Sequence, residues 1–149
     1  LTGALIPLMP GDLLSLANKS IENSLKINIF SKHLQFLGYK DMAEAAAEMG
    51  FDGVDVSVRP NGHVLPENVE TDLPKVVEAL KKVNFTPLIM TTAVADANNP
   101  VDRKVLTTAA RLGFKFYRMN YYGYPDGKEM TASLELFQQK IKELSLLNK

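Results

Sequence analysis

Residues 49–66, MGFDGVDVSVRPNGHVLP, decide the fold, because in this short stretch a helix ends, a strand runs and a loop opens. Gly50 is a typical residue at a helix C-terminus. Valines alternate with polar residues over 53–58, which is the pattern of an extended strand. Residues 59–63, RPNGH, then turn the chain into a loop. The stretch therefore predicts a helix, a strand and a polar loop in direct succession.

The predicted strand has two different faces, because side chains alternate along an extended backbone. Its three valines lie on one face, and Asp55, Ser57 and Arg59 lie on the other. A parallel strand that is buried on both faces is more often apolar throughout. The valine face fits beneath a helix, whereas the polar face is either solvated or directed toward a polar ligand.

The same unit recurs along the chain. Strand starts near 26, 53, 86 and 116 lie about thirty residues apart, the spacing of βαβ units in a parallel sheet. The predicted strands cover 26–30, 53–58, 86–91 and 116–120, and the predicted helices cover 40–49, 69–83, 100–112 and 130–147. Such a chain forms either a small doubly wound sheet or the first half of an eight-stranded (β/α)8 TIM barrel.

Two observations favour the half barrel. No Gly-rich phosphate loop follows the first strand, where a dinucleotide-binding domain carries one. The loops after the strands are long and polar or aromatic, while the returns after the helices are short. Half a barrel leaves open sheet edges, so we expect the remainder of the barrel or a second copy of the chain to cover them.

Apolar residues at helical spacing identify the helix faces that we expect in the core. The two clearest sets are Leu73, Val76, Val77 and Leu80 in one helix, and Leu134, Phe137, Ile141 and Leu144 in the last helix.

Composition limits the class of protein. The 149 residues fit one domain, and 46% of them are hydrophobic, as in a globular protein. Lys plus Arg and Asp plus Glu both number 17, so no net field favours nucleic acid or an anionic membrane. The absence of cysteine excludes disulfides, Cys-ligated metals and a thiol nucleophile.

Residues 1–22 differ from the rest of the chain. Residues 1–20 are apolar and interrupted by two prolines, too short a run for a membrane span. Ser15 and Ala17 are small residues at the positions that a signal peptidase requires. We expect a signal-peptide remnant and therefore an exported or periplasmic protein, or else an N-terminal arm on a cytoplasmic one. Because the chain starts without methionine and stops within a helical pattern, we expect a piece of a longer protein.

Three segments carry a family resemblance: INIFSKHLQFL, AAEMGFDGVDVSVRPNGHVLPENV and DLPKVVEALKK. With them, the chain resembles the sugar phosphate isomerase/epimerase family of xylose isomerase-like TIM barrels. The GFDGVD piece is similar to much of that superfamily, and SKHLQFL and RPNGHVLPE are similar to an exported branch. The resemblance implies that residues 23–149 form the N-terminal half of the barrel.

The resemblance also implies a chemistry. Such enzymes transfer a proton next to a carbonyl group of a sugar or sugar phosphate, with a divalent metal (Mn, Mg or Zn) held by later strands outside this segment. No metal ligand is carried over here. The third predicted strand ends at Thr91 and Thr92, and the fourth at Asn120 and Tyr121, which argues against a trinuclear zinc site and DNA repair.

Barrel enzymes build their sites at the C-terminal ends of the strands, so polar residues there are candidates. His63 is the candidate catalytic residue, because imidazole exchanges protons near neutral pH, and Arg59 can bind phosphate or carboxylate through its planar fork. Glu67 either orients His63 or starts a helix. The further candidates for substrate binding are His33, Asp55, Thr91, Arg118, Asn120 and Tyr122.

Each candidate also has a structural alternative. His33 is either a substrate contact or a packing histidine beside Phe36. Asp55 either accepts a hydrogen bond from a sugar hydroxyl or pairs with Arg59 or Arg118. The tyrosines after the fourth strand either stack on a sugar or pack their loop against the rim.

The sequence thus favours the first half of a sugar isomerase or epimerase barrel. The alternatives are an exported carbohydrate-binding barrel without catalysis, and a truncated fragment or four-unit sheet that acts only through an interface.

Overall fold

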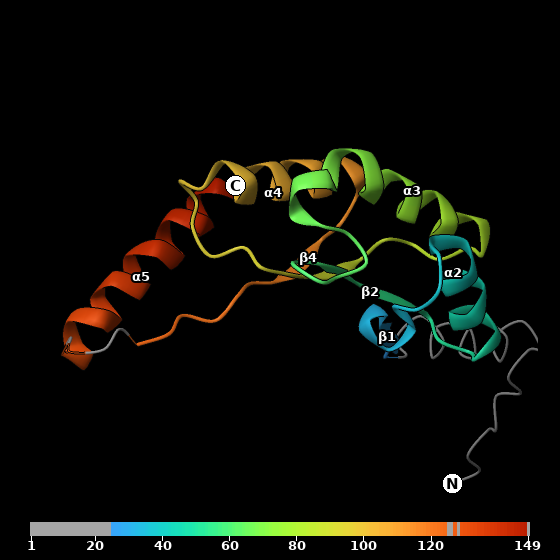
Figure 1. Ribbon diagram of the computed structural model, residues 1–149, viewed down its shortest axis with the longest axis horizontal. Coiled ribbons are helices and arrows are strands. Elements are labelled where there is room, and N and C mark those ends of the chain that lie inside the picture. Colours follow the sequence, from blue (N-terminus) through green and yellow to red (C-terminus); the bar gives the residue numbers. More distant parts are fainter. Residues whose placement is uncertain (1–24, 125–126, 128, 149) are drawn as a thin grey trace, which may run out of the picture.

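Helices and parallel strands alternate along the whole described chain, which confirms the α/β class (Figure 1). The computed structural model describes residues 25–124, 127 and 129–148. Its main elements are β1 (Asn28–Phe30), α2 (Tyr39–Glu48), β2 (Gly53–Val58), α3 (Val69–Lys82), β3 (Ile89–Thr92), α4 (Pro100–Leu112), β4 (Phe116–Arg118) and α5 (Met130–Leu147). Two short 3-10 turns, η1 (Ser31–Leu34) and η2 (Pro66–Asn68), follow β1 and precede α3.

The strands form one parallel sheet in the order β1-β2-β3-β4. Each strand pairs with its neighbour in sequence, so the order lacks the reversal that defines a doubly wound sheet. Figure 1 shows α2, α3 and α4 along one side of the sheet, and none of the described helices covers its other side. All strand C-terminal ends therefore meet at one edge of a sheet that has one covered face and one open face.

The core lies between the sheet and the helices. The three valines of β2 and Met90 of β3 are buried on the covered face, as the alternation predicts. The predicted face of α3 is fully confirmed, because Leu73, Val76, Val77 and Leu80 all belong to the buried core. Burial of each such side chain contributes about 1.5–3 kcal/mol to folding, which makes this layer the main source of stability.

Local signals set most element ends. The Asn99 side chain accepts hydrogen bonds from the backbone N–H groups of Val101 and Asp102, and Pro100 occupies the first helical position of α4. Gly113 ends the same helix at φ 96°, a conformation that other residues adopt only under strain. The predicted bounds of α4, α5 and β2 are confirmed.

Three strands differ slightly from their predicted bounds. β1 begins at Asn28 rather than at 26, and β3 covers Ile89–Thr92 rather than 86–91. Pro87 has no N–H to donate to a ladder, which accounts for the later start of β3. β4 ends at Arg118 because the Asn120 N–H bonds to the Val94 carbonyl, in the loop beyond β3, at 2.8 Å.

The prediction that α5 carries a core face is wrong for most of the helix. Leu144 is buried, but Leu134 is 43% exposed and Ile141 is 48% exposed. In Figure 1 only the C-terminal end of α5 approaches α4, and the rest of the helix extends away from the sheet. Among the described residues, no element lies opposite the first turns of α5.

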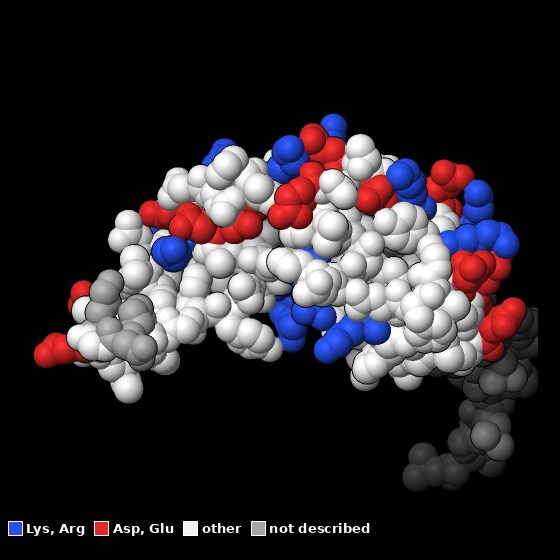
Figure 2. All heavy atoms as spheres, viewed as in Figure 1, with Lys and Arg blue, Asp and Glu red and all other residues white. Residues whose placement is uncertain are grey.

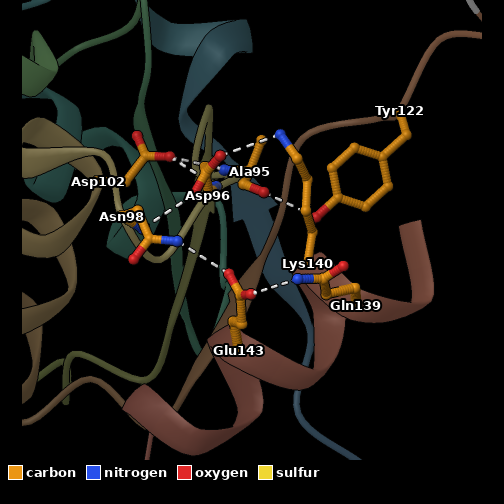
Figure 3. Close-up of polar contacts among 8 residues, drawn as sticks. All are labelled: Ala95, Asp96, Asn98, Asp102, Tyr122, Gln139, Lys140 and Glu143. Atoms are coloured by element: carbon orange, nitrogen blue, oxygen red, sulfur yellow. Dashed lines mark hydrogen bonds and ion pairs between the residues drawn. The ribbon is translucent and has the colours of Figure 1, made fainter. Parts of the chain in front are cut away.

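Polar contacts attach α5 to the loop between β3 and α4 (Figure 3). Lys140 pairs with Asp96 at 3.0 Å, and the Asn98 side chain donates to Glu143 at 2.9 Å. Asp102 accepts from the backbone N–H groups of Ala95 and Asp96 and so shapes the loop that receives the helix. These contacts fix the middle of α5 without burying its apolar side.

The expectations for residues 1–22 lie outside the described residues. None of the described helices is long and apolar enough to cross a membrane.

Candidate functional site

The open face of the sheet carries the candidate site. Phe30 pairs in register with Asp55, Ser57 with Thr91, and Thr91 with Arg118. Partners in a parallel ladder direct their side chains to the same face, opposite the buried valines. We call this surface the open face: Phe30, Asp55, Ser57, Thr91, Phe116 and Arg118 from the strands, with Arg59 beyond the end of β2.

Asp55 and Thr91 form the centre of the open face. The Thr91 hydroxyl donates to Asp55 Oδ2 at 2.8 Å, and Thr91 is almost fully buried. The other carboxylate oxygen, Oδ1, is buried without a hydrogen-bond partner among the described residues. Burial raises the pKa of the Asp55 carboxyl above its usual value, against the smaller opposing effects of the Thr91 hydrogen bond and the charge of Arg118. The carboxyl group is thus suited to accept a hydrogen bond from a ligand hydroxyl, or to hold a proton.

The guanidinium of Arg118 lies over the ring of Tyr121, 5.4 Å from its centroid. One of its nitrogens, Nη1, donates to the Tyr121 hydroxyl at 3.1 Å. The ion pairs of the described chain include neither Arg118 nor Asp55, so the expected pairing of Asp55 with an arginine does not form.

Arg59 lies over Phe30 on the other side of the open face. Its guanidinium carbon is 5.9 Å from the centroid of the Phe30 ring. Its Nε is buried and has no hydrogen-bond partner among the described residues. An unsatisfied buried donor of this kind costs about 1–3 kcal/mol, so a ligand oxygen that reaches it would restore a favourable contact.

The loop after Arg59 needs its glycine. A Cβ at Gly62 would stand 2.8 Å from the Ser57 carbonyl oxygen and 2.9 Å from the Arg59 carbonyl oxygen. Real side chains do not tolerate such contacts with backbone, so glycine alone fits this turn. The turn folds the following residues back, where the Val64 N–H donates to the Ser57 carbonyl.

The His63 ring contacts the chain after β1, at Leu37 and Tyr39. Its Nε2 is 3.3 Å from the Leu37 carbonyl oxygen, and Nδ1 is buried without a partner among the described residues. Burial lowers the pKa of the imidazole, although nearby backbone hydrogen bonds oppose the change. The ring is therefore neutral near pH 7 and holds the loop that carries Arg59 against the chain after β1.

Ser31 is a site residue that the sequence reasoning missed. Its hydroxyl accepts from the Ser57 N–H at 2.9 Å and donates to the Ser57 hydroxyl at 3.0 Å. The Ser57 hydroxyl in turn accepts from the His63 N–H at 3.0 Å. This buried chain joins β1, β2 and the His63 loop. The sequence signal that could have identified Ser31 is its position directly after an apolar strand.

The remaining candidates spread around the rim. His33 is exposed and meets Phe30 edge-on at 6.1 Å, and Phe36, beside which one of its two alternatives placed it, is 81% exposed. Asn120 is exposed beyond β4. Glu67 lies in the first turn of η2, which supports its interpretation as a helix-start acid.

Tyr122 is directed toward α5 rather than toward the open face. Its ring stacks on Phe137 at 4.9 Å, and its hydroxyl donates to the Ala95 carbonyl at 2.7 Å. The structure thus brings together Asp55, Thr91 and Arg118 and separates them from Tyr122 and His63.

Charge is distributed differently on the two sides of the molecule. Figure 2 shows acidic and basic side chains mixed over the helices, whereas basic side chains gather without acidic neighbours in the hollow on the opposite side. Asp55 is the only acid within the four strands. Within the described residues, no group of three or more His, Asp or Glu side chains could hold a metal ion.

A cavity of about 530 Å³ lies between α4, β4 and the end of α5, next to the open face. Phe116, Leu106 and Leu147 contribute to its walls. It lies beside β4, the last strand of the described sheet.

No protein-family model matches the chain, and no curated protein or solved structure matches it either.

Proposed function

We propose that this chain is the substrate-binding first half of a (β/α)8 barrel of the sugar isomerase/epimerase type. The sequential order of the parallel strands and the placement of α2, α3 and α4 on one face support this reading, because a barrel is built by continuing that pattern. Within the described part of the chain, β1 and β4 each have only one neighbouring strand, and their outer edges are where the remaining barrel, or a second copy, would join.

The observation that carries the proposal is the Asp55–Thr91 pair with Arg118 on the adjacent strand. A carboxylate, a hydroxyl and a guanidinium at the C-terminal side of a parallel sheet form a set that suits a polyhydroxylated ligand. The Asp55 carboxylate accepts a hydrogen bond from a sugar hydroxyl, and the guanidinium groups of Arg59 and Arg118 donate hydrogen bonds to ligand oxygens. His33 and Asn120 lie at the rim of the open face. His63 positions the Arg59 loop.

The proposed reaction moves a proton from a carbon next to a carbonyl to the neighbouring carbon or to the other face. The described residues do not fit a divalent metal, because the single carboxylate of the open face is held by Thr91 near a guanidinium. The residues of the open face therefore act on the substrate directly and not through a bound metal. The acid and base that handle the carbon-bound proton belong to later strands of the barrel.

Calorimetric titration of the intact protein with a panel of ketoses, with and without manganese, tests the proposal. We expect a ketose to bind, and Asp55→Asn to weaken it about tenfold to a hundredfold, as loss of a charged hydrogen bond does. Glu67→Gln, which changes an exposed acid outside the open face, is the matched control and should leave binding unchanged. Absence of binding to every ketose would contradict the proposal, and binding without isomerisation would favour a carbohydrate-binding barrel.

A further inference from the structure

A cavity and a pair of exposed apolar side chains lie at opposite edges of the sheet. The cavity opens beside the start of β4, where Leu106, Phe116 and Leu147 contribute to its walls. Phe116 is 61% exposed although it belongs to a strand. At the other edge, Leu25 and Ile27 precede β1 and are 94% and 64% exposed. One chain thus carries an apolar hollow at one edge and unburied apolar side chains at the other.

Strand alternation places the hollow and the exposed isoleucine on the same side of the sheet. Ile29 of β1 pairs in register with Val54, whose side chain is buried on the covered face. Ile27 lies two residues before Ile29, so its side chain points to the same face in an extended chain. The cavity also reaches this face, because α4 forms one of its walls. A strand placed beside β4 in the direction of β1 would therefore direct Ile27 into the cavity.

Both edges also present backbone groups to a further strand. The Phe116 N–H donates to the Leu88 carbonyl beside β3, so the N–H and C=O of the next residue, Tyr117, face the outer edge. In the same way, the Ile27 carbonyl accepts a hydrogen bond from the chain before β2, so the backbone groups of Asn28 face outward. Edges of this kind are templates for pairing with another chain.

A second copy of this chain fits both edges at once. The four strands are parallel and lie in sequential order. A twofold axis along the strands brings β4 of each copy beside β1 of the other, and it keeps all strands pointing in one direction. The two joints are then identical, and the eight strands close into a barrel in which no edge remains. The helices stay outside, and the two open faces meet inside.

Charges near the two edges are complementary as well. Glu48 ends α2, at the β1 end of the helical layer, and Lys115 directly precedes β4 (Figure 1). Both side chains are exposed, and neither takes part in an ion pair within the described part of the chain. Both residues lie at the N-terminal edge of the sheet, where helices end and strands begin. The twofold arrangement therefore places opposite charges on the same side of each joint.

From these observations we propose that two copies of this chain associate through two identical joints. In each joint, β1 of one copy pairs with β4 of the other, and Ile27 enters the cavity beside Phe116. This inference rests on the half-barrel part of the proposed function and names its partner, but it does not depend on sugar binding. Each Asp55–Thr91 pair is then enclosed in part by the other copy. The first turns of α5 extend away from the sheet and lie outside the joints (Figure 1).

Sedimentation equilibrium of the full chain over a series of concentrations, without sugar, tests the inference. We expect a monomer–dimer equilibrium. Ile27→Lys and Phe116→Glu should each weaken the dimer at least about tenfold, because each places a charge in both apolar joints. Both side chains are exposed in the single chain, so the variants should fold, which circular dichroism checks. Leu65→Glu changes an exposed apolar residue in the loop after β2 and is the matched control, which should leave the dimer within about twofold.

Mixing the two variants tests which edges meet. In a mixed dimer, one joint combines β1 of the Phe116→Glu copy with β4 of the Ile27→Lys copy, and both of these edges are native. The other joint brings the two substituted side chains together with opposite charges. The equimolar mixture should therefore recover the dimer at concentrations at which each variant alone is monomeric.

The outcomes separate this inference from the proposed sugar binding. A chain that stays monomeric at every concentration would overturn the inference and leave both edges to the rest of a longer protein. Loss of the dimer in Phe116→Glu alone, with Ile27→Lys unaffected, would overturn it in favour of a joint between two β4 edges. A mixture that fails to recover would contradict the pairing of unlike edges. A dimer that binds no ketose would support the inference and contradict sugar binding, whereas a monomer that binds a ketose would do the reverse.

Discussion

Helices α3 and α5 carry similar apolar stripes but lie in different surroundings. In α3 the stripe is buried against the sheet, and Leu73 is 0% exposed. In α5 the stripe is largely exposed, and only Leu144 near its C-terminal end reaches the core. Neighbouring helices flank α3 on both sides, whereas α5 meets the fold through a few polar contacts and its last turns. Helical periodicity therefore identifies the face that a helix can bury, and the neighbouring elements decide whether it is buried.

The sharpest way to test this comparison is to truncate one leucine in each helix. Leu73→Ala should lower the free energy of unfolding by about 2–5 kcal/mol, because it opens a cavity in the core. Leu134→Ala should change it by less than about 0.5 kcal/mol, because that side chain is already solvated. Urea denaturation followed by circular dichroism measures both. A large loss for Leu134→Ala would mean that the α5 stripe is covered in solution, by a second copy or another segment.

The second test concerns the attachment of α5. Tyr122→Ala removes the stack on Phe137 and the hydrogen bond to Ala95, and it should destabilise the docking of α5 by about 1–3 kcal/mol. Hydrogen exchange should become faster in α5 and stay unchanged in α3. Tyr122→Phe keeps the stack and should show the smaller part of the effect. Equal acceleration in both helices would show that α5 docking is coupled to the whole fold.

The smallest expected effect is a pH dependence of stability that arises at His63, whose ring contacts the chain after β1. The folded-state pKa of His63 lies below its unfolded value of about 6.5. The unfolded chain therefore binds more protons between those two values, so stability is full above about pH 6.5 and declines as the pH falls toward the folded-state pKa.

Urea denaturation between pH 5 and pH 8 measures this decline. His63→Asn should reduce it, and hydrogen exchange at pH 5.5 should accelerate near the His63 loop before it does so in α5. An unchanged decline in His63→Asn would assign the pH dependence to other groups.

Much of the fold could be predicted because its signals are local. The recurrence of strands and helices, the caps at Asn99 and Gly113, and the valine face of β2 all depend on near neighbours in sequence. The contact between Asp55 and Thr91, in contrast, depends on the strand order and on the register of β2 and β3, which alternation within one strand does not specify. The directions of His63 and Tyr122 could not be predicted, because loop side chains follow the tertiary contacts available to them.

The sequence by itself determined which residues share a face and where most helices and strands begin and end, since those depend on backbone periodicity and on local hydrogen bonding. The tertiary structure decided the sequential strand order, the exposure of α5 and the burial of His63. Each of these depends on which distant element lies opposite a given surface, and the periodicity within one segment does not specify that element.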